Sequence, residues 1–279
     1  MNGGIVMFQV NRDICIACKQ CIKDCPTKVI TLEEGKAEIH NDWGCIKCGH
    51  CLAICPVFAI STDDYDMGEV IPYEKEKFEV DPDQLLRFIK FRRSVRRFKD
   101  KPVEKEKIEQ IIEAGRFTQT STNNQDVSYI VIQDQIDEVR RMALDTLKKR
   151  GEEMLANMTP ETEYLRRYAK AWIRMHELYY GDAKKDRLFF HAPAVILVTT
   201  PTPLNGGLAS SNMELMIDAL GLGTFFSGFF ITALQNNQKL KDYLGITEKN
   251  PVVSCIVLGY PDVKYQRSVP RKKPDIRWI

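Results

Sequence analysis

Eight of the nine cysteines fall into two copies of one spacing. The first copy is Cys15, Cys18, Cys21 and Cys25-Pro26, and the second is Cys45, Cys48, Cys51 and Cys55-Pro56. Each cysteine of the second copy lies 30 residues after its counterpart. Three thiolates at i, i+3 and i+6 can wrap one corner of a four-iron cubane, and a fourth must come from elsewhere in the chain. The spacing therefore predicts two [4Fe–4S] clusters, which are groups that pass single electrons.

The spacing resembles that of bacterial ferredoxins, in which the fourth cysteine of each run ligates the other cluster. This resemblance implies that one cluster is held by Cys15, Cys18, Cys21 and Cys55. It implies that the other is held by Cys45, Cys48, Cys51 and Cys25. Because the ligands cross between the copies, we expect that neither copy folds stably alone.

Two other uses of cysteine are less consistent with the pattern. Zinc sites usually pair two short cysteine knuckles and need neither a third cysteine at i+6 nor a trailing Cys-Pro. Disulfides are typical of secreted chains, and residues 1–13 lack a basic start followed by a long apolar run. The ninth cysteine, Cys255, lies in the apolar run 252–258, which predicts a buried strand and a structural role.

Length and charge limit the number of domains and the classes of partner that the chain is expected to have. Its 279 residues favour two domains, and a net charge of +2 gives no reason to expect a nucleic-acid partner. No apolar run approaches the roughly 20 residues that span a bilayer, so we expect a cytoplasmic protein without a membrane segment. Residues 62–84 carry nine acidic residues and two lysines. We therefore predict domains at 1–64 and 85–279, joined by an acidic linker at 65–84.

The second domain has the mixed pattern of an α+β fold. Helices are predicted at 103–117, 136–155, 160–180 and 208–220, and strands at 127–132, 194–200, 224–230 and 252–258. Gly221 and Gly223 indicate a helix stop, and no Walker or G-x-G-x-x-G sequence is present. Aromatic side chains recur every four residues at Tyr164, Tyr168 and Trp172. Such a stripe is usually packed in a core, although it could also line a site for an aromatic substrate.

Four stretches in order resemble the nitroreductase family of FMN enzymes. They are residues 92–98 with Pro102-Val103, residues 120–125, residues 212–228, and residues 269–274. Together they cover residues 85 to about 275. The loop at 120–125 departs from the family pattern, because Asp126-Val127 follows Gln125 where the family often has Pro-Trp. A ferredoxin segment ahead of this domain resembles the clostridial-type ferredoxin/nitroreductase fusions.

The resemblance implies a nitroreductase-like FMN-binding fold and a set of cofactor contacts. Guanidinium and hydroxyl groups at Arg92, Arg93 and Ser94 would bind the phosphate and ribityl side of FMN, since guanidinium groups hold phosphates by charge-assisted hydrogen bonds. Arg271 and Lys273 would join them from the far end of the chain, although Lys272 competes for that role. The contacts to the ring would come from Arg96, Thr120, Ser121, Asn123, Ser227 and Gly228. Arg96 matches a family lysine at the pyrimidine edge, and its charge would stabilise the reduced flavin.

These motifs predict a flavin-dependent oxidoreductase in which the clusters pass electrons to FMN and FMN reduces a small acceptor, such as a nitroaromatic or quinone-like compound. No side chain stands out as a catalytic acid or base, and none is required if solvent supplies the proton. The electron donor could be a ferredoxin. Two alternatives stay open: an NAD(P)H-driven nitroreductase with structural or electron-exporting clusters, and a redox-sensing module without turnover. The resemblance also implies a homodimer with FMN at the subunit interface.

Overall fold

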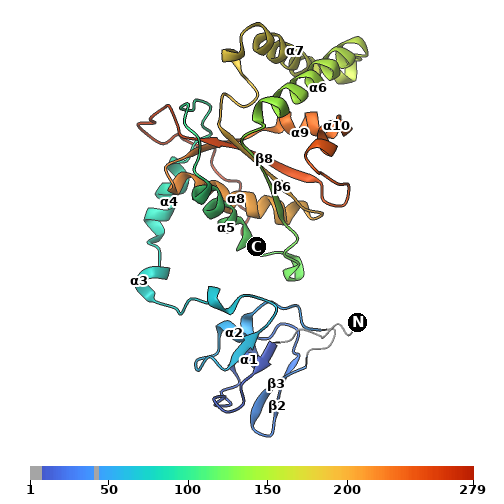
Figure 1. Cartoon of the computed structure of the whole chain (residues 1–279). Coiled ribbons are helices and arrows are strands. Elements are labelled where there is room, and N and C mark those ends of the chain that lie inside the picture. The colour runs from blue at the N-terminus through green and yellow to red at the C-terminus, as the bar shows by residue number, and fades with distance from the viewer. Residues whose placement is uncertain (1–7, 41–43) are drawn as a thin grey trace. The chain divides into compact units, whose positions relative to one another are not determined.

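The computed structural model describes residues 8–40 and 44–279. By their contacts, the residues form two compact units, Met1–Val80 with Thr120–Asn124, and Asp81–Gln119 with Gln125–Ile279. Figure 1 labels the elements of both units. Within the described residues, no helix combines the length and the apolar character needed to cross a membrane.

The first unit contains two short antiparallel strand pairs and two short helices. Strand β1 (Phe8–Val10) pairs with β4 (Ile60–Thr62), and β2 (Ile30–Glu33) pairs with β3 (Lys36–Ile39). The helices are α1 (Gln20–Asp24) and α2 (His50–Ala53), and η1 (Met67–Glu69) and α3 (Lys75–Phe78) follow β4. Its small core contains Phe8, Ile30 and Ile39 together with several of the cysteines. The segment predicted as a linker therefore contains two helical turns.

The second unit is built around a four-stranded antiparallel sheet with the strand order β5-β6-β8-β7. The strands are β5 (Ser128–Ile132), β6 (Ala194–Thr199), β7 (Gly223–Phe226) and β8 (Val252–Gly259). Along β6 all six residues are buried, because side chains that alternate between the two faces are covered on both sides. Cys255 of β8 is buried with 1% of its surface exposed, which confirms the prediction of a buried strand there.

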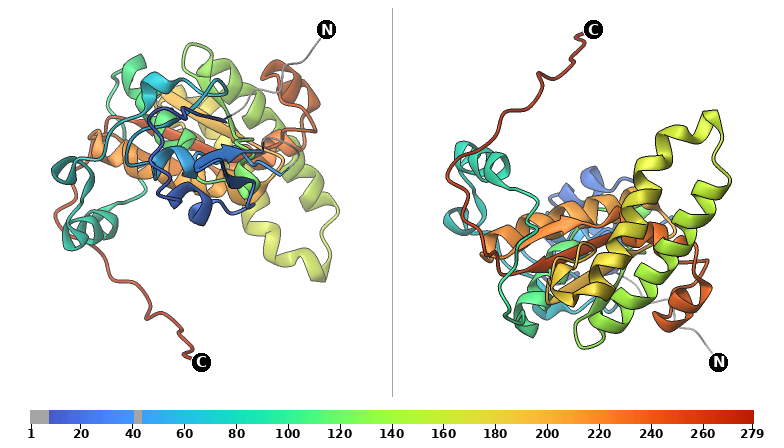
Figure 2. Two further views of the ribbon diagram at one scale, coloured as in Figure 1. Left: turned by 90° about the horizontal axis from the view of Figure 1, so that it is seen from below. Right: turned by 90° about the horizontal axis from the view of Figure 1, so that it is seen from above.

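Helices cover both faces of this sheet (Figures 1 and 2). One face packs on α5 (Lys105–Arg116) and α8 (Pro203–Ala219), through residues such as Ile111, Met213 and Ile196. The other face packs on α6 (Ile136–Ala156), α7 (Arg166–Gly181) and α9 (Gly228–Gln235), through residues such as Leu144 and Phe230. The predicted α+β fold is confirmed.

Other elements lie at the ends and connections of these helices. Helix α4 (Pro82–Phe91) begins the second unit, and α10 (Gln238–Tyr243) follows α9. The 3-10 turns η3 (Pro160–Leu165) and η4 (Ala183–Lys185) flank α7, and η2 (Ser121–Asn123) belongs to the first unit. Trp172 of α7 is buried and meets Phe229 edge to face, as a core residue does. Tyr164, by contrast, is exposed.

One predicted strand is wrong over half its length. The apolar run 224–230 forms strand β7 only as far as Phe226, and the chain then enters α9 at Gly228. The Ser227 hydroxyl accepts a hydrogen bond from the Phe230 backbone N–H (3.3 Å), so Ser227 caps the new helix. Helix α9 is buried against the sheet and carries few polar residues, so its sequence does not show the amphipathic pattern of a surface helix.

Candidate functional site

The eight cysteines of the two motifs lie around two cavities of the first unit. One cavity is lined by Cys15, Cys18, Cys21 and Cys55. The other is lined by Cys25, Cys45, Cys48 and Cys51. Each cavity thus takes three cysteines from one motif and the fourth from the other, which is the crossed arrangement that the resemblance implies.

The walls of both cavities are apolar and suit a metal–sulfur cluster. Ile16, Ile22 and Leu32 line the first cavity, and Val29 and Ile46 line the second. The Ala59 backbone N–H donates to the Sγ atom of Cys55 (3.2 Å). Dry walls and N–H donors to the thiolate sulfurs are the features by which proteins hold iron–sulfur clusters and set their potentials. The residues present therefore fit a cluster in each cavity.

The backbone repeats along with the cysteines. Three positions of the first motif have a positive φ: Ala17 (54°), Lys19 (61°) and Lys28 (60°). The positions 30 residues later, Lys47 (54°), Gly49 (73°) and Phe58 (52°), also have a positive φ. Non-glycine residues adopt this conformation rarely, and they keep it where the surrounding structure requires it. The tight winding of the chain around each cavity accounts for the repetition.

The thiols differ in their electrostatic surroundings. The pKa of Cys15 is lowered, chiefly by a hydrogen bond from the Ala37 backbone, although burial opposes this. For Cys25, burial acts to raise the pKa, but hydrogen bonds from Thr27 and neighbouring backbone groups outweigh it and the pKa falls. Burial raises the pKa of Cys21, and it raises the pKa of Cys51 to about 12. A metal that binds as the proton leaves would offset this cost of burial.

In the second unit, the segment 92–98 runs beside strand β7. Ser94 forms a bridge with Thr224, and the Val95 N–H donates to the Thr224 carbonyl oxygen (2.9 Å). The Arg96 guanidinium lies 5.2 Å from the centre of the Phe225 ring. This pairing places the segment that carries Arg92, Arg93, Ser94 and Arg96 beside β7, the strand that Ser227 and Gly228 follow.

Gly223 makes this close approach possible. A Cβ atom at Gly223 would lie 2.5 Å from Cγ2 of Val95. The sequence prediction treated this glycine as part of a helix stop, and Gly221, with a φ of +72°, does end the α8 segment. Gly223 instead leaves room for the segment that carries the arginines.

Two carboxylates of α8 lie near Arg92. The Arg92 guanidinium forms an ion pair with Glu214 (2.8 Å), and both side chains are largely buried. Burial raises the pKa of Asp218, one turn further along α8, to about 6, although the charge of Arg92 opposes this shift. Burial also raises the pKa of Glu214. Neither carboxylate was expected to be part of this region, since α8 showed no unusual acidic pattern.

The other residues that were expected to contact FMN are not part of this pairing with β7. Thr120, Ser121 and Asn123 belong to the first compact unit, in which the Asn123 amide donates to the carbonyl oxygen of Lys47 (2.9 Å). Arg271 and Lys273 lie on the exposed C-terminal segment, which extends away from the body of the second unit (Figure 2). The structure therefore places the arginine segment beside the strand that leads to residues 227–228, but it does not bring Arg271 or Lys273 to that strand.

The segment after Gln125 is held by polar contacts that the sequence did not indicate. The Asp126 carboxylate accepts hydrogen bonds from the Thr202 hydroxyl (2.9 Å) and from the amide of Asn205 (2.8 Å), which is buried in α8. These hydrogen bonds lower the pKa of Asp126, although burial opposes them. The aspartate that departs from the family pattern therefore anchors this segment to the start of α8.

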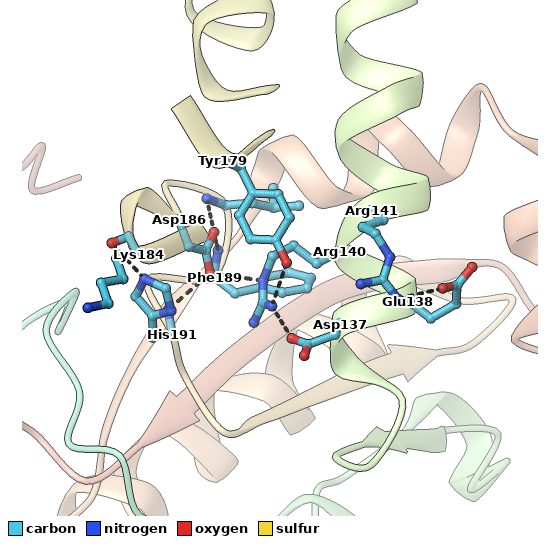
Figure 3. Close-up of polar contacts among 10 residues, drawn as sticks. Asp137, Glu138, Arg140, Arg141, Tyr179, Lys184, Asp186, Phe189 and His191 are labelled. Carbon is cyan, nitrogen blue, oxygen red and sulfur yellow. Dashed lines mark hydrogen bonds and ion pairs between the residues drawn. The ribbon is translucent and has the colours of Figure 1, made fainter. Parts of the chain in front are cut away.

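A buried ion pair supports the loop that precedes β6 (Figure 3). The Arg140 Nε atom lies 2.9 Å from the Asp186 carboxylate, whose side chain is fully buried. The same carboxylate accepts the backbone N–H groups of Leu188 (2.8 Å), Phe189 (3.1 Å) and His191 (3.0 Å). Phe190, in the same loop, has a φ of +54° and packs edge to face on Phe225. The ion pair thus fixes the loop that carries Phe190. The Phe190 ring packs against Phe225, and Phe225 in turn lies beneath the Arg96 guanidinium.

Comparisons with known proteins agree with this geometry. The sequence matches the family model "Nitroreductase family" over residues 89–260 and the model "4Fe-4S dicluster domain" over residues 7–56. No curated protein matches the chain in sequence.

Solved structures with the same fold as the second unit include several FMN proteins. An FMN-dependent nitroreductase from Clostridium difficile R20291 has a TM-score of 0.51 at 20% identity, over 70% of this chain and 100% of its own. A nitroreductase with bound FMN from Bacteroides fragilis has the same TM-score and identity, over 70% and 99%. A BluB-like flavoprotein from Clostridium difficile 630 has a TM-score of 0.51 at 22% identity, over 68% and 94%.

The fold and the family model together define a flavin-dependent oxidoreductase with a ferredoxin-type 4Fe-4S domain at its N-terminal end. More specifically, the chain belongs to the nitroreductase family.

Proposed function

We propose that this protein is an oxidoreductase in which two [4Fe–4S] clusters deliver single electrons to FMN for the reduction of a small acceptor. One observation carries the proposal: the same chain combines two cavities, each lined by four cysteines, with the nitroreductase fold. Clusters of this type transfer one electron each, whereas the acceptor gains two electrons and takes two protons from solvent. The donor proposed here is a ferredoxin or another one-electron carrier of low potential.

We assign the residues around the flavin as follows. Arg92, Arg93 and Ser94 would hold the phosphate side, since a guanidinium binds a phosphate by two parallel hydrogen bonds. Arg271 and Lys273 would join them from the C-terminal segment. Arg96 would place a positive charge at the ring, and Thr120, Ser121, Asn123, Ser227 and Gly228 would supply polar contacts. When bound, FMN would supply the redox chemistry that links one-electron delivery to two-electron reduction, and no side chain is proposed as an acid or base.

The first test follows the absorbance of the reconstituted protein under anaerobic conditions. Reduced ferredoxin is added to one sample, and NADH or NADPH to another. Rapid bleaching of the cluster and flavin bands by ferredoxin, but not by the nucleotides, supports the proposal. Flavin reduction by NADH or NADPH ahead of the clusters supports the alternative, a pyridine-nucleotide nitroreductase whose clusters are structural or export electrons. Absence of turnover with every acceptor supports a redox-sensing module.

Cysteine variants give the matched control. Cys15→Ala with Cys45→Ala removes one thiol from each cavity, whereas Cys255→Ala removes a buried thiol from β8 that lines neither cavity. We expect ferredoxin-driven flavin reduction to be lost only in the first variant. Unchanged flavin reduction in a folded double variant contradicts the proposed electron route. Nitroaromatics and quinones serve as test acceptors.

A homodimer in a reducing, cytoplasmic compartment completes the proposal. Helix α4 has no buried residue and exposes Leu85, Leu86 and Ile89, and Phe226 at the end of β7 is also exposed. Apolar side chains on one helix face are typical of a subunit contact. Eight cysteines that bind clusters also require a compartment in which thiols stay reduced. Sedimentation analysis tests the dimer, and Leu86→Glu is expected to shift it toward the monomer.

A further inference from the structure

The two cysteine cavities differ in the charge beside them. The Lys36 ammonium group donates a hydrogen bond to the backbone carbonyl oxygen of Cys15 (2.5 Å). Cys15 belongs to the cavity that Cys55 completes, and Ala37, next to Lys36, lines the same cavity. A unit positive charge is therefore fixed next to a proposed cluster ligand of the first cavity.

Several other basic side chains of the first unit lie beside carboxylates. Arg12 lies between Glu34 (3.2 Å) and Glu38 (3.1 Å). Near the second cavity, Lys47 pairs with Asp64 (3.0 Å). His50, which lines that cavity, lies 3.2 Å from a carboxylate oxygen of Asp24.

Lys36 differs from these basic side chains. Among residues 8–40 and 44–279, no carboxylate lies within ion-pair distance of its ammonium group. Its charge is therefore not cancelled by a neighbour in this part of the chain, and it acts on the first cavity.

A nearby positive charge favours the reduced state of a cluster. Reduction of [4Fe–4S]²⁺ to [4Fe–4S]⁺ adds one electron and makes the cluster with its four thiolates more negative. Net charge, hydrogen bonds and solvent exposure are the factors that set such potentials. An ammonium group at this range interacts strongly where the surroundings are partly buried and poorly screened.

We propose that Lys36 makes the cluster held by Cys15, Cys18, Cys21 and Cys55 the more easily reduced of the two. This proposal rests on the cluster ligands assigned under the proposed function. When one electron is shared between the two clusters, it resides mainly on this one. Lys36 is then a tuning residue, which acts on the cluster through its charge and makes no bond to the iron.

The test is a redox titration of the reconstituted full-length protein, with dithionite as the reductant and electron paramagnetic resonance as the readout. Two one-electron steps are expected. In Lys36→Met we expect the step at higher potential to move down toward the other, while the step at lower potential changes little. In Lys36→Arg, which keeps the charge, the higher step is expected to stay near its original value.

Lys28→Met is the matched control, because Lys28 also donates to a backbone carbonyl oxygen, that of Lys23 (3.0 Å), but is exposed. We expect it to leave the higher step in place. Iron and sulfide contents equal to those of the unchanged protein show that the variants carry both clusters. If Lys28→Met lowers the higher step as far as Lys36→Met does, the specific role of Lys36 is overturned.

Two results with Lys36→Met also overturn the proposal: a shift of the lower step alone, or no shift of either step. The titration needs neither an electron donor protein nor an acceptor. A failure of electron transfer to FMN in the absorbance experiment therefore leaves the ranking of the clusters standing, and a wrong ranking leaves the electron route standing.

Discussion

The two candidate sites are assembled in different ways. The cysteine cavities draw their eight thiols from residues 15–55, and three thiols of each set come from one short loop. The proposed FMN residues extend from Arg92 to Lys273, and within the second unit the 92–98 segment pairs with β7, the strand that precedes Ser227 and Gly228. A site built from a local spacing depends on loop winding, whereas a site built from distant segments depends on the sheet and loops that support it. Substitutions should therefore act differently on the two sites.

The largest expected effect comes from breaking the crossed thiol set. Cys55→Ala removes the fourth thiol of the first cavity, although Cys55 belongs to the second motif. We expect the loss of about half of the bound iron, from the cluster that the first motif serves. Iron and sulfide analysis measures the loss, and hyperfine-shifted proton resonances of the cysteines identify which cluster remains. Retention of the Cys15 resonances would contradict the crossed assignment.

The second largest effect is expected in the second unit, where a buried ion pair supports the site that is built from distant segments. Asp186→Ala leaves Arg140 buried without its main partner and frees three backbone N–H groups. Removal of one member of a buried ion pair costs about 3–5 kcal/mol. Urea denaturation followed by circular dichroism should show this loss in the free energy of unfolding of the second unit.

Asp182→Ala provides the comparison for Asp186, because Asp182 is a partly exposed aspartate that precedes the same loop. Its loss removes an exposed cap hydrogen bond from the Lys184 backbone N–H and is expected to cost about 1 kcal/mol. Equal effects of the two substitutions would mean that the buried pair is not what holds the loop.

A smaller effect is expected at the close approach of the arginine segment to β7. Gly223→Ala places a methyl group against Val95, and such overpacking costs about 1–3 kcal/mol. Because the segment that carries Arg92 and Arg96 must shift, we expect FMN to bind about tenfold more weakly. Fluorescence titration of the apoprotein with FMN measures the affinity.

Gly207→Ala is the control for Gly223→Ala, since a methyl group at Gly207 of α8 would meet nothing within 4 Å. Alanine is favoured over glycine inside a helix, so this variant should be as stable as the original or more stable. Recovery of FMN affinity in the double variant Gly223→Ala/Val95→Gly, which removes the Val95 Cβ and both Cγ atoms that the new methyl group would meet, would identify this contact as the cause. No recovery would point to a different cause.

The smallest effect is a dependence of stability on pH. Burial raises the pKa of Asp218 to about 6, above its ordinary value near 4. The folded state then binds this proton more tightly than the unfolded state does, so the stabilisation is present at low pH and is lost as the pH rises from about 4 to 6. Urea denaturation at pH 4.5 and pH 7.5 gives the difference in the free energy of unfolding between these two conditions. Asp218→Asn should reduce this difference by about 1–2 kcal/mol. Asp275→Asn, in the exposed C-terminal segment, should leave the dependence unchanged.

The sequence predicted those parts of the molecule whose signals are local. The helix predicted at 136–155 is α6 within one residue, and the strand predicted at 252–258 is β8 within one residue. The helix predicted at 208–220 begins earlier, because Pro203 occupies a first-turn position that suits proline. Helix α4 was assigned in part to the linker, although Asp81 caps it and Pro82 begins it.

Contacts between residues that are far apart in the sequence could not be predicted. The ion pair between Arg92 and Glu214 joins residues of α8 and the 92–98 segment, which are far apart in the sequence. Arg140 and Asp186 are likewise ordinary charged residues until the fold buries them. Their roles depend on the pairing of elements, and a single sequence gives no direct signal of that pairing. For the two cysteine cavities, the resemblance to bacterial ferredoxins supplied the crossed pairing that the spacing alone leaves open.

The 30-residue repeat also has a consequence for the origin of the first unit. Strand β1 pairs with β4 and β2 pairs with β3, while each cavity combines thiols from both copies of the motif. A peptide with one copy would carry three thiols of one set and a single thiol for the other, so two identical peptides could complete both sets by exchange. The unit has the organisation expected of a symmetric dimer whose two halves are joined in one chain, which is what duplication of one copy would produce. Once joined, the halves could diverge, and a charge such as that of Lys36 could distinguish two sites that began as equivalent.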